Sequence, residues 1–200
     1  MDTPNDRNAL FFDAAEWPIE LLAFQRWRKR VWSMVDGERL LEVGVGTGKN
    51  IPYYPKGAAV TAVDLSPRML ARARRRARRL RREVDLREMD VQELAFSDES
   101  FDAAVSTFVF CTVPDPVLGL REVYRVLKAG AELYLLEHVL SERPVLRTLM
   151  ELANPVAVHL LGENINRRTQ RNLELAGFET RLASPVLFDV FWIFVGRKAV

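Results

Sequence analysis

The chain has 200 residues, 48% of them hydrophobic, which is enough for one α/β domain with a full core. Its 29 basic and 27 acidic residues give a net charge of +2, which excludes a protein that binds polyanions through its overall charge. No run reaches the roughly 18 apolar residues that cross a bilayer, residues 1–6 show no signal peptide, and the single cysteine, Cys111, excludes an internal disulfide, so we predict a cytoplasmic protein.

Residues 1–38 precede the first expected strand and are predicted to form a helical cap. Pro18 suits the first position of a helix, and apolar residues including Trp27 and Trp32 recur at helical spacing as far as Val35. One interpretation is a helix that caps the sheet edge. The other is an interfacial helix, because basic side chains beside tryptophans are typical of helices at membrane surfaces.

A glycine-rich turn follows the first expected strand. Leu40 to Val43 is a short apolar run typical of a strand buried on both faces, and it leads into Gly44, Gly46 and Gly48. Glycine lets a ligand approach the backbone closely, and α/β folds bind ligands at the carboxyl ends of their strands. The turn therefore predicts a binding site; the alternative is a tight turn without a ligand. A dinucleotide fingerprint would need a glycine at Lys49, which disfavours a nicotinamide-dependent reductase.

The second expected strand, Ala58 to Asp64, ends in an acidic residue twenty positions after Gly44. Nucleotide-binding βαβ units hold ribose hydroxyls with an acid at this place. Ser66 and Pro67 then begin a long helix that contains nine arginines between positions 68 and 82. We interpret the arginines as a solvated face; the alternative is contact with an anionic surface such as phospholipid headgroups.

The remaining segments alternate between strands and helices. Strands are expected at 84–90, 101–108 and 131–139, and a helix from Pro116 is predicted to end with a C-cap at Gly130. Residues 141–163 form an irregular insert whose apolar helix is predicted to break at Pro155. A helix over 166–177 and two strands, 179–188 and 190–198, follow. This alternation predicts a mostly parallel, doubly wound sheet.

Four segments, residues 41–48, 63–70, 101–105 and 122–130, together resemble class I S-adenosylmethionine (SAM) dependent methyltransferases of the ubiquinone/menaquinone-methyltransferase-like branch. Within that branch, residues 110–115 and 136–139 resemble small phosphatidylethanolamine N-methyltransferases and alkyl-thiol S-methyltransferases. The pattern usually has a second glycine at Ala131. The resemblance implies a single domain over residues 1–200, with a Rossmann-like seven-stranded sheet in the order 3-2-1-4-5-7-6 and the last strand antiparallel.

The resemblance also implies SAM as the cofactor. Residues 6–13 resemble the segment that closes over it. Glu42 is implied to belong to the cofactor site. The other implied contacts are Gly44, Gly46 and Gly48 at the methionine part, Asp64 at the ribose, Leu65 and Met69 beside the adenine, Asp90 and Val91 at its amino edge, and Ser106 and Thr107 near the methyl group.

We expect the acceptor to be small or amphiphilic: an amine, a thiol, or a quinone-like or phenolic compound. Nucleic acid is not expected, because the arginine run contains no aromatic residue for base stacking. Trp17, Phe108 and Phe110 are predicted to wall the acceptor pocket. His138 is the candidate base, with a buried, satisfied histidine as the alternative, and His159 is a second candidate.

No set of His, Asp and Glu residues has the spacing of metal ligands, so no metal is predicted. Cys111 is interpreted as a small buried hydrophobe. A lipid-like acceptor would bring the chain into peripheral contact with an anionic membrane. The alternative to an enzyme is a catalytically silent, membrane-associated module that binds SAM.

Overall fold

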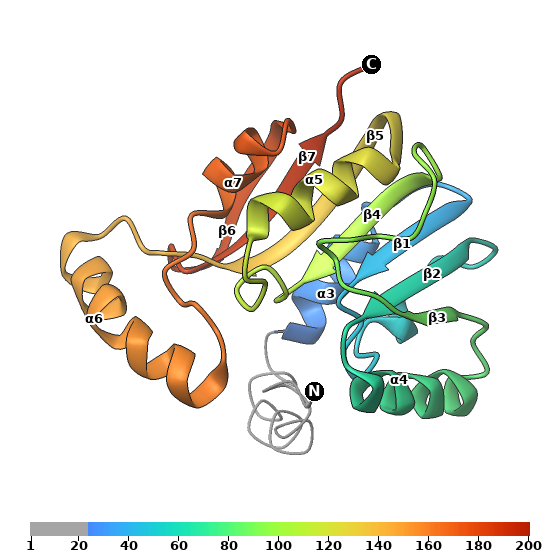
Figure 1. The fold of residues 1–200 in the computed structure, drawn as a ribbon, viewed down its shortest axis with the longest axis horizontal. Coiled ribbons are helices and arrows are strands. Elements are labelled where there is room, and N and C mark those ends of the chain that lie inside the picture. The colour runs from blue at the N-terminus through green and yellow to red at the C-terminus, as the bar shows by residue number, and fades with distance from the viewer. Residues whose placement is uncertain (1–23) are drawn as a thin grey trace.

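A computed structural model describes residues 24–200, except for the side chains of residues 160 and 161 (Figure 1). Trp17, Pro18 and residues 6–13 lie outside the described residues. The elements are α3 (Gln25–Trp32), β1 (Arg39–Val43), the 3-10 helix η2 (Ile51–Tyr53), β2 (Ala59–Asp64), α4 (Pro67–Leu80), β3 (Asp85–Glu88), β4 (Phe101–Thr107), α5 (Pro116–Val126), β5 (Leu127–His138), α6 (Pro144–Leu161), α7 (Thr169–Leu175), β6 (Glu179–Leu187) and β7 (Phe191–Arg197).

The seven strands form one sheet in the order β3-β2-β1-β4-β5-β7-β6, which confirms the predicted fold. β1 pairs in parallel with both β2 and β4, whereas β7 is antiparallel to both β5 and β6. The direction in which strands are added reverses between β1 and β4. In doubly wound sheets, ligands bind beside the carboxyl ends of the strands at such a reversal.

Helices cover both faces of the sheet, and each strand contributes side chains to both (Figure 1). Successive residues of a strand point to opposite faces. Leu40 accordingly joins the core cluster under α3 and α4, and Leu41 joins the cluster under α5 and α7. Because both faces are covered, β1 has an almost continuous apolar sequence.

The start of α4 has the capping residues that the sequence predicted. The Met69 N–H donates to Ser66 Oγ over 3.1 Å, and Pro67 occupies the first turn. Leu70 and Ala73 are fully buried against the sheet, while all nine arginines of the run are exposed or half-buried. The arginines therefore occupy the solvent side of the helix.

The predicted C-cap at Gly130 is wrong. α5 ends at Val126, and Leu127 is already paired with Phe101 of β4. Gly130 instead lies within β5, at φ +74°, beyond an irregularity in the pairing of β4 and β5. Burial of Leu127 and its strand pairing outweigh the local helix-ending signal of Lys128 and Gly130.

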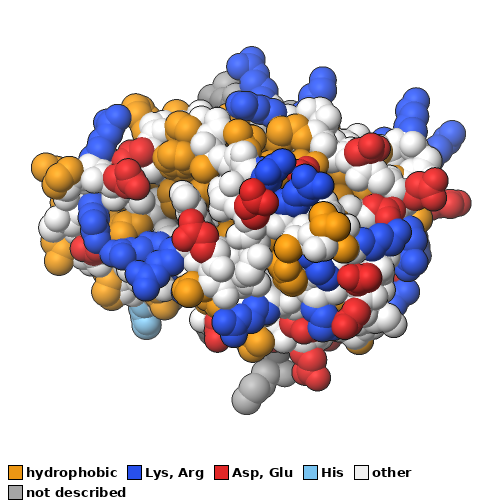
Figure 2. All heavy atoms as spheres, turned by 90° about the horizontal axis from the view of Figure 1, so that it is seen from above, with side chains coloured by type: hydrophobic (Ala, Val, Ile, Leu, Met, Phe, Trp, Pro, Cys, Tyr) orange, Lys and Arg blue, Asp and Glu red, His pale blue; other side chains and the backbone are white. Residues whose placement is uncertain are grey.

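The predicted break at Pro155 is also wrong, since α6 runs unbroken from Pro144 to Leu161. A proline inside a helix removes one backbone donor and crowds the preceding turn, which can kink a helix without ending it. Much of α6 projects from the sheet, and Val145 and Leu152 are 76% and 71% exposed. Figure 2 shows hydrophobic side chains at this end of the molecule. Across residues 24–200, every helix is too short or too polar to cross a membrane.

α3 covers a face of the sheet and does not cap its edge. Trp32 is buried, with its ring centroid 4.6 Å from that of Tyr54. Trp27 packs against Phe24 and Phe191. Burial removes Trp32 from any membrane interface, which contradicts the interpretation of α3 as an interfacial helix presenting both tryptophans.

Candidate functional site

A cavity of about 440 Å³ lies beyond the carboxyl ends of β1, β2 and β4. Its volume falls within the usual range for small-molecule sites. A second cavity of about 480 Å³, beside α7 and β7, contains none of the predicted site residues. Nine predicted residues line the first cavity: Gly44, Gly46, Asp64, Leu65, Met69, Asp90, Val91, Thr107 and Phe108.

The three glycines of the turn have different surroundings, although all have positive φ. A Cβ on Gly44 would lie 2.3 Å from Val109 Cγ2, and one on Gly48 would lie 2.6 Å from Ile51 Cδ1. A Cβ on Gly46 would meet no atom within 4 Å. Gly44 and Gly48 are therefore required by packing, whereas Gly46 leaves open space above the backbone inside the cavity.

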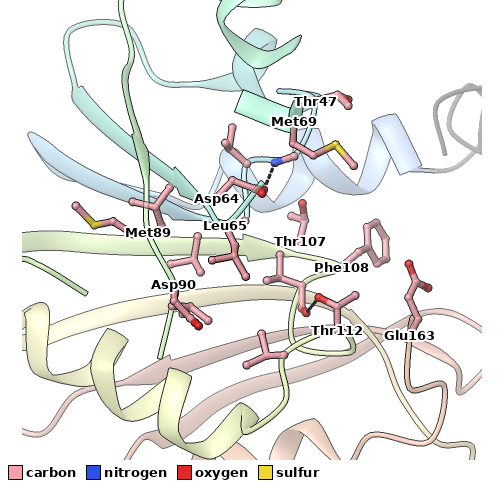
Figure 3. Close-up of a pocket in the computed structure, with 18 of the residues that line it drawn as sticks. Thr47, Asp64, Leu65, Met69, Met89, Asp90, Thr107, Phe108, Thr112 and Glu163 are labelled. Carbon is pink, nitrogen blue, oxygen red and sulfur yellow. Dashed lines mark hydrogen bonds between the residues drawn. The ribbon is translucent and has the colours of Figure 1, made fainter. Parts of the chain in front are cut away.

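Asp64 joins the end of β2 to the glycine turn. One carboxylate oxygen accepts the Gly46 N–H over 2.8 Å (Figure 3), and the other accepts the Ser66 N–H over 2.9 Å. These two bonds fix the carboxylate against the cavity wall. Leu65, the next residue, is 52% exposed although it is a large aliphatic side chain. An exposed leucine in a cavity is a surface that an apolar ligand group can cover.

Asp90 is held by Gln92, a cavity residue that the sequence did not single out. Asp90 Oδ1 accepts the Gln92 backbone N–H over 2.8 Å. The side-chain oxygen of Gln92 accepts the N–H of Asp115, the N-cap residue of α5. A short chain of hydrogen bonds thus ties this end of the cavity to the beginning of α5.

Glu42 does not line the cavity but lies fully buried below it. Its carboxyl group accepts the Asn50 side-chain amide over 2.6 Å and the Tyr54 hydroxyl. Burial raises the pKa of Glu42 to about 8, although Asn50 and the charge of Arg28 act in the opposite direction. Glu42 therefore contributes to the cavity indirectly, by holding the side chain of Asn50.

Arg28 of α3 reaches the cavity, and sequence reasoning missed it. Its Nη1 donates to Thr107 Oγ1 over 2.6 Å and to Asn50 Oδ1 over 3.2 Å, and its guanidinium lies 5.1 Å from the Phe108 ring centroid. Its basic neighbours Arg26, Lys29 and Arg30 are exposed, whereas Arg28 is 6% exposed and shares the buried face of the helix with Val31. The sequence does contain a signal for the burial of Arg28, because positions 24, 28, 31 and 35 follow helical spacing and therefore share one face of the helix.

Several other predicted residues lie away from the cavity. Ser106 and Phe110 are buried, and Ser106 Oγ has no hydrogen-bond partner among the described residues. His138 packs edge-on against Phe191, and burial lowers its pKa to about 4. His159 is exposed on α6, and Cys111 is buried with its pKa raised by desolvation. Within residues 24–200, no three His, Cys, Asp or Glu side chains gather as a metal site would require.

The end of the cavity opposite Asp90 is formed by the loop after β4 and by the residues after α6 (Figure 3). Glu137 Oε1 accepts the backbone N–H groups of Val109 and Phe110, over 3.0 and 3.2 Å, and so holds this loop. Burial raises the pKa of Glu137 to about 7. Phe108 is apolar, and Glu163 adds a carboxylate at the same end.

A model of the methyltransferase domain family matches residues 41–135. Demethylmenaquinone methyltransferase of Chlorobaculum parvum is 34% identical over 200 residues, which cover 86% of this chain and 81% of that protein. Phosphatidylethanolamine N-methyltransferase of Cereibacter sphaeroides is 42% identical over 109 residues, 54% of each chain. Thiol S-methyltransferase TMT1A of Homo sapiens is 34% identical over 158 residues, 76% of this chain and 65% of that protein. The chain thus spans about half of the length of the phosphatidylethanolamine methyltransferase and about two thirds of the length of the thiol methyltransferase.

Solved structures share the fold. A SAM-dependent methyltransferase of Thermotoga maritima, titled a possible histamine N-methyltransferase, has a TM-score of 0.77 at 22% identity and covers 99% of this chain and 100% of its own. The [4+2]-cyclase SpnF has a TM-score of 0.73 at 24% identity, covering 88% of this chain and 81% of its own. A methyltransferase and a cyclase therefore have this fold in common, so the reaction must be argued from the site.

Proposed function

Because the chain belongs to the SAM-dependent methyltransferases, we propose that it transfers a methyl group from SAM to a small or amphiphilic acceptor. The observation that carries this proposal is the turn at Gly46. There the backbone borders open cavity space, and its N–H is held by the Asp64 carboxylate. Such a turn lets a cofactor pass close to the main chain.

The residues around the cavity fit the parts of SAM. Asp64 would accept hydrogen bonds from the ribose hydroxyls, as acids do at this place in βαβ units. Leu65 and Met69 would cover the faces of the adenine. Asp90 would accept from the adenine amino group, with Val91 beside it. Gly46 leaves the space that the methionine part requires.

Arg28 completes the cofactor end. SAM carries an amino-acid carboxylate, and a guanidinium is the side chain best suited to bind a carboxylate in two places. Arg28 lines the cavity beside Gly46 and Thr107 and is held by Thr107 and Asn50. We propose that it binds the carboxylate of the cofactor, with Glu42 positioning Asn50 behind it.

When bound, SAM supplies a methyl group on a positively charged sulfur. The task left to the protein is mainly to hold the acceptor atom in line with that methyl group, which can contribute roughly 7–11 kcal/mol in favourable cases. The apolar side chains of Phe108, Val109 and Val113 would exclude water from the acceptor. The loop that carries them is held by Glu137.

The acceptor class in this proposal is an amine, a thiol or a quinone-like compound, in line with the names of the relatives. For a lipid-like acceptor, we propose that the exposed arginines of α4 meet an anionic membrane. Flotation with anionic and neutral vesicles at low and high salt tests this contact. Binding restricted to anionic vesicles and lost at high salt would support it.

The proposed function is tested by calorimetric titration with SAM, followed by incubation with methyl-labelled SAM and a panel of amines, thiols and phenols. We expect saturable SAM binding and label in at least one acceptor. Val145→Ser, an exposed position on α6 outside the cavity, serves as a control that should keep both. SAM binding without transfer to any acceptor would favour a silent binding module, and failure to bind SAM would refute the proposal.

A further inference from the structure

Phe108 has a backbone conformation that is uncommon for a residue with a side chain. It directly follows Thr107, the last residue of β4, and its φ is +60°. The left-handed region is unfavourable for any residue that carries a Cβ. Phe188 also has a positive φ, but it lies in the turn between β6 and β7, where hairpin turns often require one. β4 leads instead to α5, so the strain at Phe108 needs another explanation.

The positive φ places the Phe108 ring on the α3 side of the sheet. Side chains of an extended strand alternate between its two faces. In β4, Ala104 belongs to the core cluster under α5 and α7, and Val105 belongs to the cluster under α3 and α4. Thr107 follows this alternation, because its hydroxyl accepts a hydrogen bond from Arg28 of α3. Phe108 would face α5 if the backbone stayed extended, but it packs against the cluster under α3 and α4.

On the α3 side, the Phe108 ring meets Phe24 and Arg28, which are four residues apart and share one face of the helix. Its centroid lies 4.7 Å from that of the Phe24 ring and 5.1 Å from the guanidinium carbon of Arg28. Phe191 of β7 lies edge-on to it, with ring centroids 6.1 Å apart. Figure 3 shows Phe108 and Thr107 close together at the cavity. The left-handed turn thus brings two consecutive side chains of one strand onto the same guanidinium.

We propose that Phe108 is a positioning residue for Arg28, and that its ring holds the guanidinium where the carboxylate of SAM would bind. The inference rests on the proposed function and gives Phe108 a role toward the cofactor as well as the acceptor. Thr107 and Asn50 accept hydrogen bonds from Arg28 Nη1, and the aromatic ring adds a contact that guanidinium groups favour. Holding a side chain in its binding orientation lowers the cost of ordering it when the ligand arrives.

The role predicts a loss confined to ligands that carry the amino-acid part of the cofactor. S-adenosylhomocysteine and 5′-methylthioadenosine share the adenine, the ribose and a thioether, but only the first carries a carboxylate. Phe108→Leu keeps an apolar side chain and removes the aromatic face. In calorimetric titrations it should weaken binding of S-adenosylhomocysteine by roughly 2- to 30-fold, the range for a cation–π contact. Its affinity for 5′-methylthioadenosine should equal that of the wild type.

Two control variants separate this role from general packing. Phe188→Leu is the matched control, because Phe188 shares the positive φ but is 70% exposed and lies outside the cavity. It should change neither affinity. The second control is the Arg28→Met background, where Phe108→Leu should no longer alter the ratio of the two affinities, because the contact through which it acts is absent. An undiminished effect in that background would overturn the inference.

Thermal unfolding tests the strained backbone separately. Alanine and glycine at position 108 both remove the ring, and glycine is usually the less stabilising of the two. At φ +60° the order should reverse, so Phe108→Gly should unfold at a higher temperature than Phe108→Ala. The opposite order would contradict the left-handed backbone on which the placement of the ring depends.

The titrations also distinguish failure of the inference from failure of the proposed function. An equal loss for both ligands in Phe108→Leu would show that the ring only packs the site. Unchanged affinities for both would show that it serves only as a wall of the acceptor pocket. Either result would overturn the inference and leave methyl transfer intact. Wild-type protein that binds neither SAM nor S-adenosylhomocysteine would overturn the proposed function itself.

Discussion

Replacing Gly46 by alanine separates the binding role of the turn from its structural role. The new Cβ would meet no protein atom, so the fold is affected only through the positive φ of +53°. A non-glycine residue in the left-handed region costs roughly 1–2 kcal/mol. For a chain of this size that corresponds to a fall in Tm of about 2–8 °C. The folded variant should nevertheless lose SAM affinity by at least about tenfold, because the methyl group occupies the cofactor's space.

Gly44→Ala is the matched control in the same turn. Its Cβ would lie 2.3 Å from Val109, so a clash adds to the same backbone strain and the variant should be much less stable than Gly46→Ala. Thermal unfolding and calorimetric titration with SAM give both quantities for each variant. Unchanged SAM affinity in a folded Gly46→Ala protein would refute our interpretation of the open space, and equal stabilities of the two variants would refute the packing argument.

Three further predictions concern the cofactor end. Asp64→Ala should weaken SAM binding by roughly 1.5–3 kcal/mol for each hydrogen bond to the carboxylate that is lost; titration of a folded variant with wild-type affinity would exclude the ribose assignment. Arg28→Lys keeps the charge but loses the fork geometry, so SAM affinity should fall while that for adenosine stays unchanged; an equal loss for both ligands would contradict this. Glu42 has its pKa raised to about 8 by burial, so the folded state holds a proton that the unfolded state releases above about pH 4.5, and stability should fall as pH rises from 5 to 8. Denaturant unfolding should show a flatter pH dependence in Glu42→Gln, and an unchanged slope would disprove the assignment.

The sheet could be predicted because its signals are local and repeated. Apolar runs such as Leu40 to Val43, each followed by a turn or a capped helix, reveal a buried parallel strand without any knowledge of its neighbours. The two wrong boundaries have a common cause. Gly130 and Pro155 are both local signals that a helix ends. At Gly130 the helix had already given way to a strand, and at Pro155 the helix continued through the proline, and neither outcome can be read from the local sequence alone.

The site residues that could be predicted from the sequence are those at or just beyond the ends of strands. Asp64 is the last residue of β2 and Asp90 lies just beyond β3, so the pattern of strands alone placed them at one edge of the sheet. Glu163 follows a helix in an irregular segment, and nothing in its neighbourhood indicates that α6 returns the chain to the cavity. His138 shows the reverse case, because its place at the end of β5 suggested the cavity while its ring turns to Phe191.

The insertion of β7 between β5 and β6 has a consequence for folding during synthesis. β5 is complete at His138, but the strand that covers its edge begins only at Phe191. Until β7 has been made, the nascent chain would present β5, with Leu135 and Leu136, as an open edge that can pair with another chain. Chains truncated before Phe191 are therefore expected to aggregate. They lack β7, which is made last but lies inside the sheet, where it covers β5.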